Sequence, residues 1–193
     1  IVRTLLENFD LTENAVYRIN GPVNLNRAVQ VYDLVQRADL KFPPFQPRPL
    51  AGIDTMFETV SRGDVLLHHP FDAFTPVLEL LRQAADDPSV LAIKQTLYRS
   101  GKDSQIVDAL VQAARKGKDV TVVVELRARF DEEANLGFAD RLQEAGVQVV
   151  YGVVGYKTHA KMLLIVRREG RVLRRYVHLG TGNYHAGTAR QYT

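Results

Sequence analysis

The sequence predicts an α/β fold in which a largely parallel sheet carries helices on both faces. From residue 53 onward, short apolar runs alternate with segments whose apolar residues recur at helical spacing. The run over 120–124 is apolar on both faces, which is typical of a strand covered by helices on each side. Two expected helices end in glycine, at Gly117 and Gly146, just before the next strand candidate.

The first 48 residues follow a different pattern. Residues 16–19 predict a short strand, and 25–36 predict a helix. Residues 42–49 then contain four prolines, which can neither continue a helix nor complete a sheet ladder. We therefore expect a domain boundary, with 1–48 as the tail of a preceding domain plus a linker and 49–193 as a catalytic subdomain.

Helix and strand candidates alternate after this boundary. They are a helix over 54–62, a strand over 65–68, a helix over 74–85, a strand over 90–97, a helix over 104–115, a strand over 120–125, a helix over 132–144 and a strand over 147–151. Two further runs, 159–166 and 172–179, are joined by a turn at 168–170 and predict an antiparallel hairpin.

Composition excludes several classes of protein. With no apolar run near 18 residues, no transmembrane segment is expected. The absence of cysteine excludes disulfides and thiolate metal sites, and it fits a cytoplasmic location. The net charge of +3 is too small to indicate a nucleic-acid partner, and the five arginines over 167–175 are best interpreted as a solvated hairpin.

His159 and Lys161 carry the strongest chemical signal. Residues two apart in a strand share one face, so an imidazole and a permanent cation are expected side by side. A neutral imidazole, with an unperturbed pKa of about 6.5, can attack phosphorus, and a lysine offsets the charge on the phosphate oxygens. The following residues 180–183, Gly-Thr-Gly-Asn, offer flexible backbone, a hydroxyl and an amide to a phosphoryl oxygen. A lone histidine on a strand is more often structural, so the prediction of phosphate chemistry depends on the combination.

The other histidines are weaker candidates. His68 and His69 are adjacent, so in a strand they face opposite sides and cannot easily bind one metal ion. His178 and His185 flank the glycine element, where they can orient phosphate or serve a structural role.

The His-x-Lys and Gly-Thr-Gly-Asn elements resemble half of a phospholipase D-type site. In that pattern an Asp follows the lysine after four residues, but here Val166 occupies the position. This departure argues against an ordinary phosphodiesterase and favours a relative that kept the nucleophile alone.

Five blocks in order closely resemble the long-chain polyphosphate kinase family, whose catalytic domain is phospholipase D-like. They are residues 64–70, 94–104, 122–135, 157–161 and 178–183, and the similarity also includes 21–25 and 39–44. The resemblance therefore covers nearly the whole chain. It implies reversible transfer of the terminal phosphate of ATP to inorganic polyphosphate through a phosphohistidine at His159, with Lys161 as the second catalytic residue.

The resemblance also implies the residues that bind substrate. Tyr192 corresponds to the nucleotide-contacting tyrosine, and Asn183 is expected to bind phosphate. The two magnesium-associated arginines correspond to Arg99 and Arg129. Because a guanidinium has no lone pair and cannot ligate a metal, we expect both to grip phosphate oxygens that carry Mg²⁺.

Two other functions stay open on the sequence. One is a phospholipase D-type phosphodiesterase half-domain, and the other is a non-catalytic module that binds polyphosphate. Since only one His-x-Lys element is present, a partner half is expected beyond Thr193, and the isolated chain is expected to be inactive. The full-length enzyme is expected to be a homo-oligomer that uses ATP or ADP and polyphosphate.

Overall fold

The computed structural model describes residues 1–50, 55–98, 104–125, 132–152 and 155–190, with the side chains of 132–136 left out. The chain divides into two compact units, 1–45 and 46–193. The division falls within the proline-rich residues 42–49.

The first unit contains short helices and no buried side chain, and all of its residues are described. Its helices are α1 (Val2–Asn8) and α2 (Val29–Leu34), with 3-10 turns at Glu13–Ala15, Leu25–Ala28 and Ala38–Leu40. The helix predicted over 25–36 is therefore present as a 3-10 turn followed by α2. The strand predicted over 16–19 is wrong, because this unit offers no neighbouring strand to complete a ladder.

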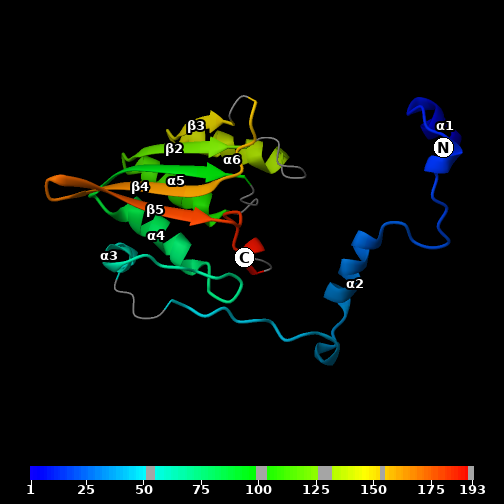
Figure 1. Cartoon of the computed structure of the whole chain (residues 1–193), viewed down its shortest axis with the longest axis horizontal. Coiled ribbons are helices and arrows are strands. Elements are labelled where there is room, and N and C mark those ends of the chain that lie inside the picture. Colours follow the sequence, from blue (N-terminus) through cyan, green and yellow to red (C-terminus); the bar gives the residue numbers. More distant parts are fainter. Residues whose placement is uncertain (51–54, 99–103, 126–131, 153–154, 191–193) are drawn as a thin grey trace. The chain divides into compact units, whose positions relative to one another are not determined.

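A five-stranded mixed sheet organises the second unit, in the order β3-β2-β1-β4-β5 (Figure 1). The strands are β1 (Val90–Leu97), β2 (Asp119–Val124), β3 (Gln148–Tyr151), β4 (Lys161–Glu169) and β5 (Val172–Gly180). β1, β2 and β3 are parallel, whereas β4 is antiparallel to β1 and β5 is antiparallel to β4. The predicted α/β class and the antiparallel hairpin are confirmed.

The register places one apolar layer across the sheet. Ile93 of β1 pairs with Val120 of β2 and with Ile165 of β4, and all three side chains are buried. Because side chains alternate along a strand, Val122 and Val124 of β2 and Leu163 of β4 join this layer and are buried as well. The layer forms the core that the helices cover.

The helices of the second unit are α3 (Met56–Arg62), α4 (Thr75–Asp86), α5 (Gln105–Arg115) and α6 (Glu132–Glu144). α3 packs on α4, α4 on α5, and α5 on α6, so they form one continuous layer behind the sheet (Figure 1). The opposite face leaves Met162, Val177 and Leu179 exposed in the described residues. Of the two predicted helical layers, the described part of the chain contains this one.

Local signals explain where α3 and α5 begin and where α5 ends. Thr55 accepts a hydrogen bond from the Glu58 backbone N–H at the start of α3, and Ser104 accepts one from Val107 at the start of α5. Gly117 follows α5 with a φ of 81°, a left-handed conformation that favours glycine at a helix end. The cap at Gly117 therefore ends α5 shortly before β2 begins at Asp119.

Residues 65–68 form no strand, so that prediction is wrong. Val65 and Leu67 are half-buried and line a cavity beside Val177 and Leu179 of β5. Leu67 packs against the buried core, so its apolar character reflects packing rather than strand pairing.

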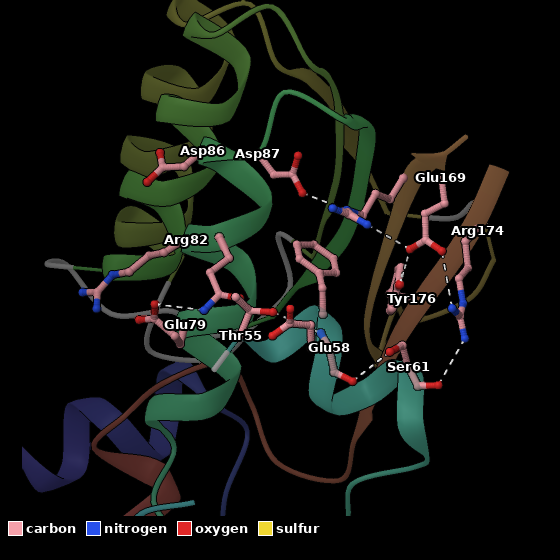
Figure 2. A pocket seen from close by; sticks show the side chains of 13 residues that line it. Thr55, Glu58, Ser61, Glu79, Arg82, Asp86, Asp87, Glu169, Arg174 and Tyr176 are labelled. Carbon is pink, nitrogen blue, oxygen red and sulfur yellow. Dashed lines mark hydrogen bonds and ion pairs between the residues drawn. The ribbon is translucent and has the colours of Figure 1, made fainter. Parts of the chain in front are cut away.

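Charged side chains tie the hairpin end of the sheet to the loop before β1 (Figure 2). Arg167 of β4 donates from Nε to Asp87 at 2.8 Å and from Nη1 to Glu169 at 3.0 Å. Burial opposes the ionisation of Asp87, but the hydrogen bonds from Arg167 and the Ser89 backbone outweigh it and lower the pKa of Asp87. The network therefore holds the carboxylate charged.

Glu169 also accepts hydrogen bonds from two side chains of β5. Tyr176 donates its hydroxyl to Glu169, and Arg174 donates from Nη1 at 3.4 Å. The hydrogen bond from Tyr176 lowers the pKa of Glu169 most, and those from Arg167 and Arg174 add to it. These groups line a cavity of about 640 Å³ at the end of the sheet opposite the start of β4 (Figure 2).

Replacement of Arg167 by Met is expected to lower the free energy of unfolding by about 2 kcal/mol, because it removes two charge-assisted hydrogen bonds and takes a positive charge away from Asp87 and Glu169. Urea unfolding followed by circular dichroism measures the change. Arg168→Met is the matched control, since Arg168 is the exposed neighbour and its loss should cost little. Equal losses in the two variants would show that the network contributes no stability.

Candidate active site

Strand ends converge at one edge of the sheet. The parallel strands β1 and β2 end there, at Leu97 and Val124, and β5 ends there at Gly180. β4 runs the opposite way, so it begins at this edge, and its first residue Lys161 pairs with Gly180. Open α/β sheets bind ligands at the carboxyl ends of their parallel strands. The edge therefore brings together the two sequence elements that predict phosphate chemistry.

His159 lies two residues before β4 and is exposed to solvent. The prediction that β4 begins at residue 159 was therefore early by two residues. The imidazole packs edge-on against the ring of Tyr98, with the centroids 5.1 Å apart and the planes at 80°. An exposed ring supported on one side by an aromatic wall is accessible to a ligand.

Lys161 brings a buried cation against this imidazole. Its side chain is 6% exposed, and its Nζ lies 3.1 Å from both His159 Nδ1 and Nε2 and 2.7 Å from the His159 carbonyl oxygen. A nitrogen in the ring plane at this distance from both ring nitrogens would clash with Cε1, so the Lys161 ammonium lies out of the plane, over the ring face. The ammonium donates a hydrogen bond to the His159 carbonyl oxygen. The lone pair and the N–H of the imidazole point outward in the ring plane and are not covered by it.

Burial lowers the pKa of the Lys161 ammonium. A buried cation gains more from a nearby anion than an exposed one does, because solvent screens it less. The position of Lys161 therefore favours an anionic ligand above His159.

Tyr98 is a candidate site residue that the sequence did not indicate. Its ring has Lys161 Nζ at 5.4 Å and Lys157 Nζ at 5.5 Å from the centroid. The ring thus lies close to two ammonium groups and to His159. The available signal was its position immediately after the last residue of β1.

The glycine element lies beside Lys161. A Cβ at Gly180 would lie 3.2 Å from His178 Cε1 and 3.7 Å from Lys161 Cβ, so a side chain there would push on the His178 ring. Gly180, Thr181 and Asn183 line a cavity of about 240 Å³ together with His178. The predicted phosphate-binding Asn183 is half-buried in this wall.

His178 is held as a neutral imidazole. Its Nδ1 lies 2.8 Å from the hydroxyl of Tyr184, which is buried. Burial, with a smaller contribution from His69, lowers the pKa of His178 to about 4, and burial raises the pKa of Tyr184. At neutral pH the pair is an uncharged support behind the glycine element.

Three predicted residues, Arg99, Arg129 and Tyr192, lie outside the described residues. β1 and β2, the strands that precede the two arginines, do end at the site edge. Among the residues that are described, no group of three or more histidine or acidic side chains could hold a metal ion. Nor does any helix within them have the length and apolar character needed to cross a membrane.

The low pKa of His178 predicts a pH-dependent stability. Because the folded value lies below the unfolded value of about 6.5, the unfolded chain takes up the proton first as the pH falls. The stability from neutral His178 is complete above about pH 6.5 and is lost toward pH 4, by up to about 1.4 kcal/mol per pH unit. Denaturant unfolding of His178→Gln between pH 7 and 4.5 should show a shallower decline. His68→Gln, at an exposed histidine, is the control, and an unchanged slope in His178→Gln contradicts the assignment.

Comparisons with known proteins agree on one family. Residues 55–193 match the family model described as polyphosphate kinase C-terminal domain 1. The chain is 81% identical over 193 residues to the polyphosphate kinase of Xylella fastidiosa strain 9a5c, with 100% of this chain and 28% of that protein covered. It is 63% identical over 192 residues to the polyphosphate kinase of Pseudomonas aeruginosa, with 98% and 28% covered.

A solved structure agrees with these sequence matches. The crystal structure of polyphosphate kinase from Porphyromonas gingivalis superposes with a TM-score of 0.71 at 35% identity, over 88% of this chain and 29% of that one. The chain thus spans 28% of the length of the Xylella and Pseudomonas relatives. With a family model over residues 55–193 and this similarity in sequence and fold, the chain belongs to the polyphosphate kinase family.

Proposed function

We propose that this chain carries a catalytic part of an enzyme that moves the terminal phosphate of ATP to inorganic polyphosphate, reversibly, through a phosphohistidine at His159. The observation that supports it most is an exposed imidazole with a buried ammonium over its ring, at the strand edge where the glycine element also lies. The shared name of the relatives supports polyphosphate as a substrate.

In the first step a neutral ring nitrogen of His159 attacks the terminal phosphorus of ATP. An N–P bond forms as the bond from that phosphorus to the bridging oxygen breaks, and ADP leaves with the electron pair. Because Lys161 lies over the ring face, both nitrogens keep their lone-pair or N–H directions in the plane, so the in-line approach is open.

In the second step the terminal oxygen of a polyphosphate chain attacks the same phosphorus. The N–P bond breaks, the electron pair returns to the imidazole, and the polymer is one phosphate longer. The steps run backward when ADP is the acceptor. One histidine therefore serves both directions.

The charge on the transferred group is offset by the buried Lys161. Preorganised cations in a partly desolvated site stabilise the transition state more than mobile solvent ions do. Asn183 and Thr181 offer an amide and a hydroxyl to the phosphoryl oxygens from the glycine element. Arg99 and Arg129 would add guanidinium groups after β1 and β2, and Tyr192 would contact the nucleotide.

We expect Mg²⁺ to bind the enzyme as a complex with ATP. The described residues provide no carboxylate or histidine cluster to ligate it, whereas the phosphate oxygens of ATP do so in solution. The cationic side chains of the protein then bind the phosphate oxygens that do not contact the metal.

Two alternatives give different products. A phospholipase D-type phosphodiesterase would cleave diesters through the same histidine, but Val166 occupies the pattern's Asp position and lies within β4, paired with Arg175. A non-catalytic module would bind polyphosphate without transferring phosphate. Parallel assays of diester hydrolysis, polyphosphate binding and ATP-driven polyphosphate synthesis separate the three.

His159→Ala in the whole enzyme should abolish labelling by ATP that carries ³²P in the terminal phosphate, because the nucleophile is gone. Loss of a nucleophile lowers turnover by roughly a thousand-fold or more. Labelling should be acid-labile and stable to base in the unmodified enzyme, as expected of an N–P bond. His68→Ala, at an exposed histidine, should label normally. Acid-labile label that persists in His159→Ala would refute the proposal.

Lys161→Met should weaken catalysis about 10- to 100-fold by removing the cation while keeping an unbranched buried chain. Steady-state polyphosphate synthesis measures the loss. Lys157→Met is the comparison, since Lys157 is an exposed lysine that also lies near the Tyr98 ring, and its loss should cost less. If the two variants are equally active, Lys161 has no special role.

A further inference from the structure

We propose that Thr96 and Glu125 are positioning residues that hold His159 and Lys161 in the reactive arrangement. This inference rests on the proposed function of His159. Thr96 hydrogen-bonds the backbone of Ala160 and Glu125 that of Thr158, so each acts on the backbone next to His159.

The segment around His159 needs such support. The main-chain pairing of β4 with β1 ends at Leu163 opposite Gln95. β4 continues to Lys161 with β5 as its paired neighbour, and His159 lies beyond the strand altogether. On the β1 side, ladder hydrogen bonds therefore stop before the two catalytic candidates.

Thr96 continues the link where the ladder stops. Its hydroxyl donates to the Ala160 carbonyl oxygen at 2.6 Å and accepts from the Met162 backbone N–H at 3.0 Å. Thr96 is 8% exposed, so these bonds do not compete with bulk water. A hydroxyl can donate and accept at once, whereas valine of nearly the same shape can do neither. The bonds grip the backbone on both sides of Lys161.

Glu125 performs the same task one strand away. It follows the last residue of β2, and its backbone N–H donates to the Leu97 carbonyl oxygen at 3.1 Å. Its side chain is 4% exposed, and Oε2 accepts from the Thr158 backbone N–H at 2.8 Å. Burial of a polar group is costly unless it is hydrogen-bonded, so this contact favours one loop position.

Together the two side chains bracket the reactive pair. The anchored backbone groups belong to Thr158, Ala160 and Met162, which alternate with His159 and Lys161. Each reactive side chain thus has an anchored residue on either side. Misplacement of a reacting group by about 1 Å can cost about 100-fold in rate. The anchors are therefore expected to affect the chemical step more than ATP binding.

The test uses the whole enzyme and rapid-quench measurement of phosphoryl uptake from labelled ATP. Thr96→Val and Glu125→Ala should each slow uptake roughly 10- to 100-fold, with the KM for ATP within about three-fold. Thr96→Ser keeps the hydroxyl, and Glu125→Gln keeps an acceptor oxygen, so each should recover much of the rate. Thr121→Val is the matched control, because its hydroxyl bonds Gln148 elsewhere in the same sheet.

A second readout does not depend on activity. Deuterium exchange at the Thr158 and Met162 amides should accelerate in Glu125→Ala and Thr96→Val, respectively, because each amide loses its acceptor. Wild-type uptake rates in both variants, or exchange that stays slow, would overturn the inference while His159 kept its role. Phosphoryl uptake by His159→Ala would instead refute the proposed function itself.

Discussion

The antiparallel pairing of β4 with β1 is the contact on which the rest of the site depends. A fourth parallel strand at this place would begin at the opposite edge, and His159 would lie far from the ends of β1 and β2. Because β4 enters in reverse, its first residue meets the last residue of β5 and lies beside the last residues of β1. The hairpin therefore brings two elements separated in sequence to one edge, and the parallel strands supply anchors.

The two ends of β4 differ electrostatically. The charges at the hairpin end are paired with one another, whereas the cation at the other end is desolvated. At the hairpin end Arg167 is matched by Asp87 and Glu169, so the charges there satisfy one another and secure the strand. At the other end Lys161 is buried against an imidazole face and has a lowered pKa caused by desolvation. An anionic substrate would relieve that cost. The cavity of about 640 Å³ beside Arg167 is lined by this paired network and lies at the end of β4 away from His159, so we assign the network a role in stability rather than in the proposed chemistry.

Local sequence signals were enough to place much of the second unit. The run over 90–97 became β1 with the predicted bounds, and Gly117 ended a helix as its position indicated. The strand predicted over 65–68 is wrong because an apolar extended segment has the same sequence pattern whether it pairs in a sheet or packs beside one. Candidate site residues with a chemical motif, such as His159, could be proposed from the sequence. Thr96 and Glu125 were not, because their importance lies in backbone groups that only the sheet register brings near.

The central claim is that one ring, His159, carries the phosphate between nucleotide and polymer. Its most direct test is mass-spectrometric mapping of the unmodified whole enzyme after mixing with Mg·ATP in the absence of polyphosphate, under basic conditions that preserve N–P bonds. The account predicts a single phosphate on the peptide that contains His159, and its loss when polyphosphate or ADP is added. Phosphate on His178 or another residue, or none while polyphosphate synthesis proceeds, would contradict it.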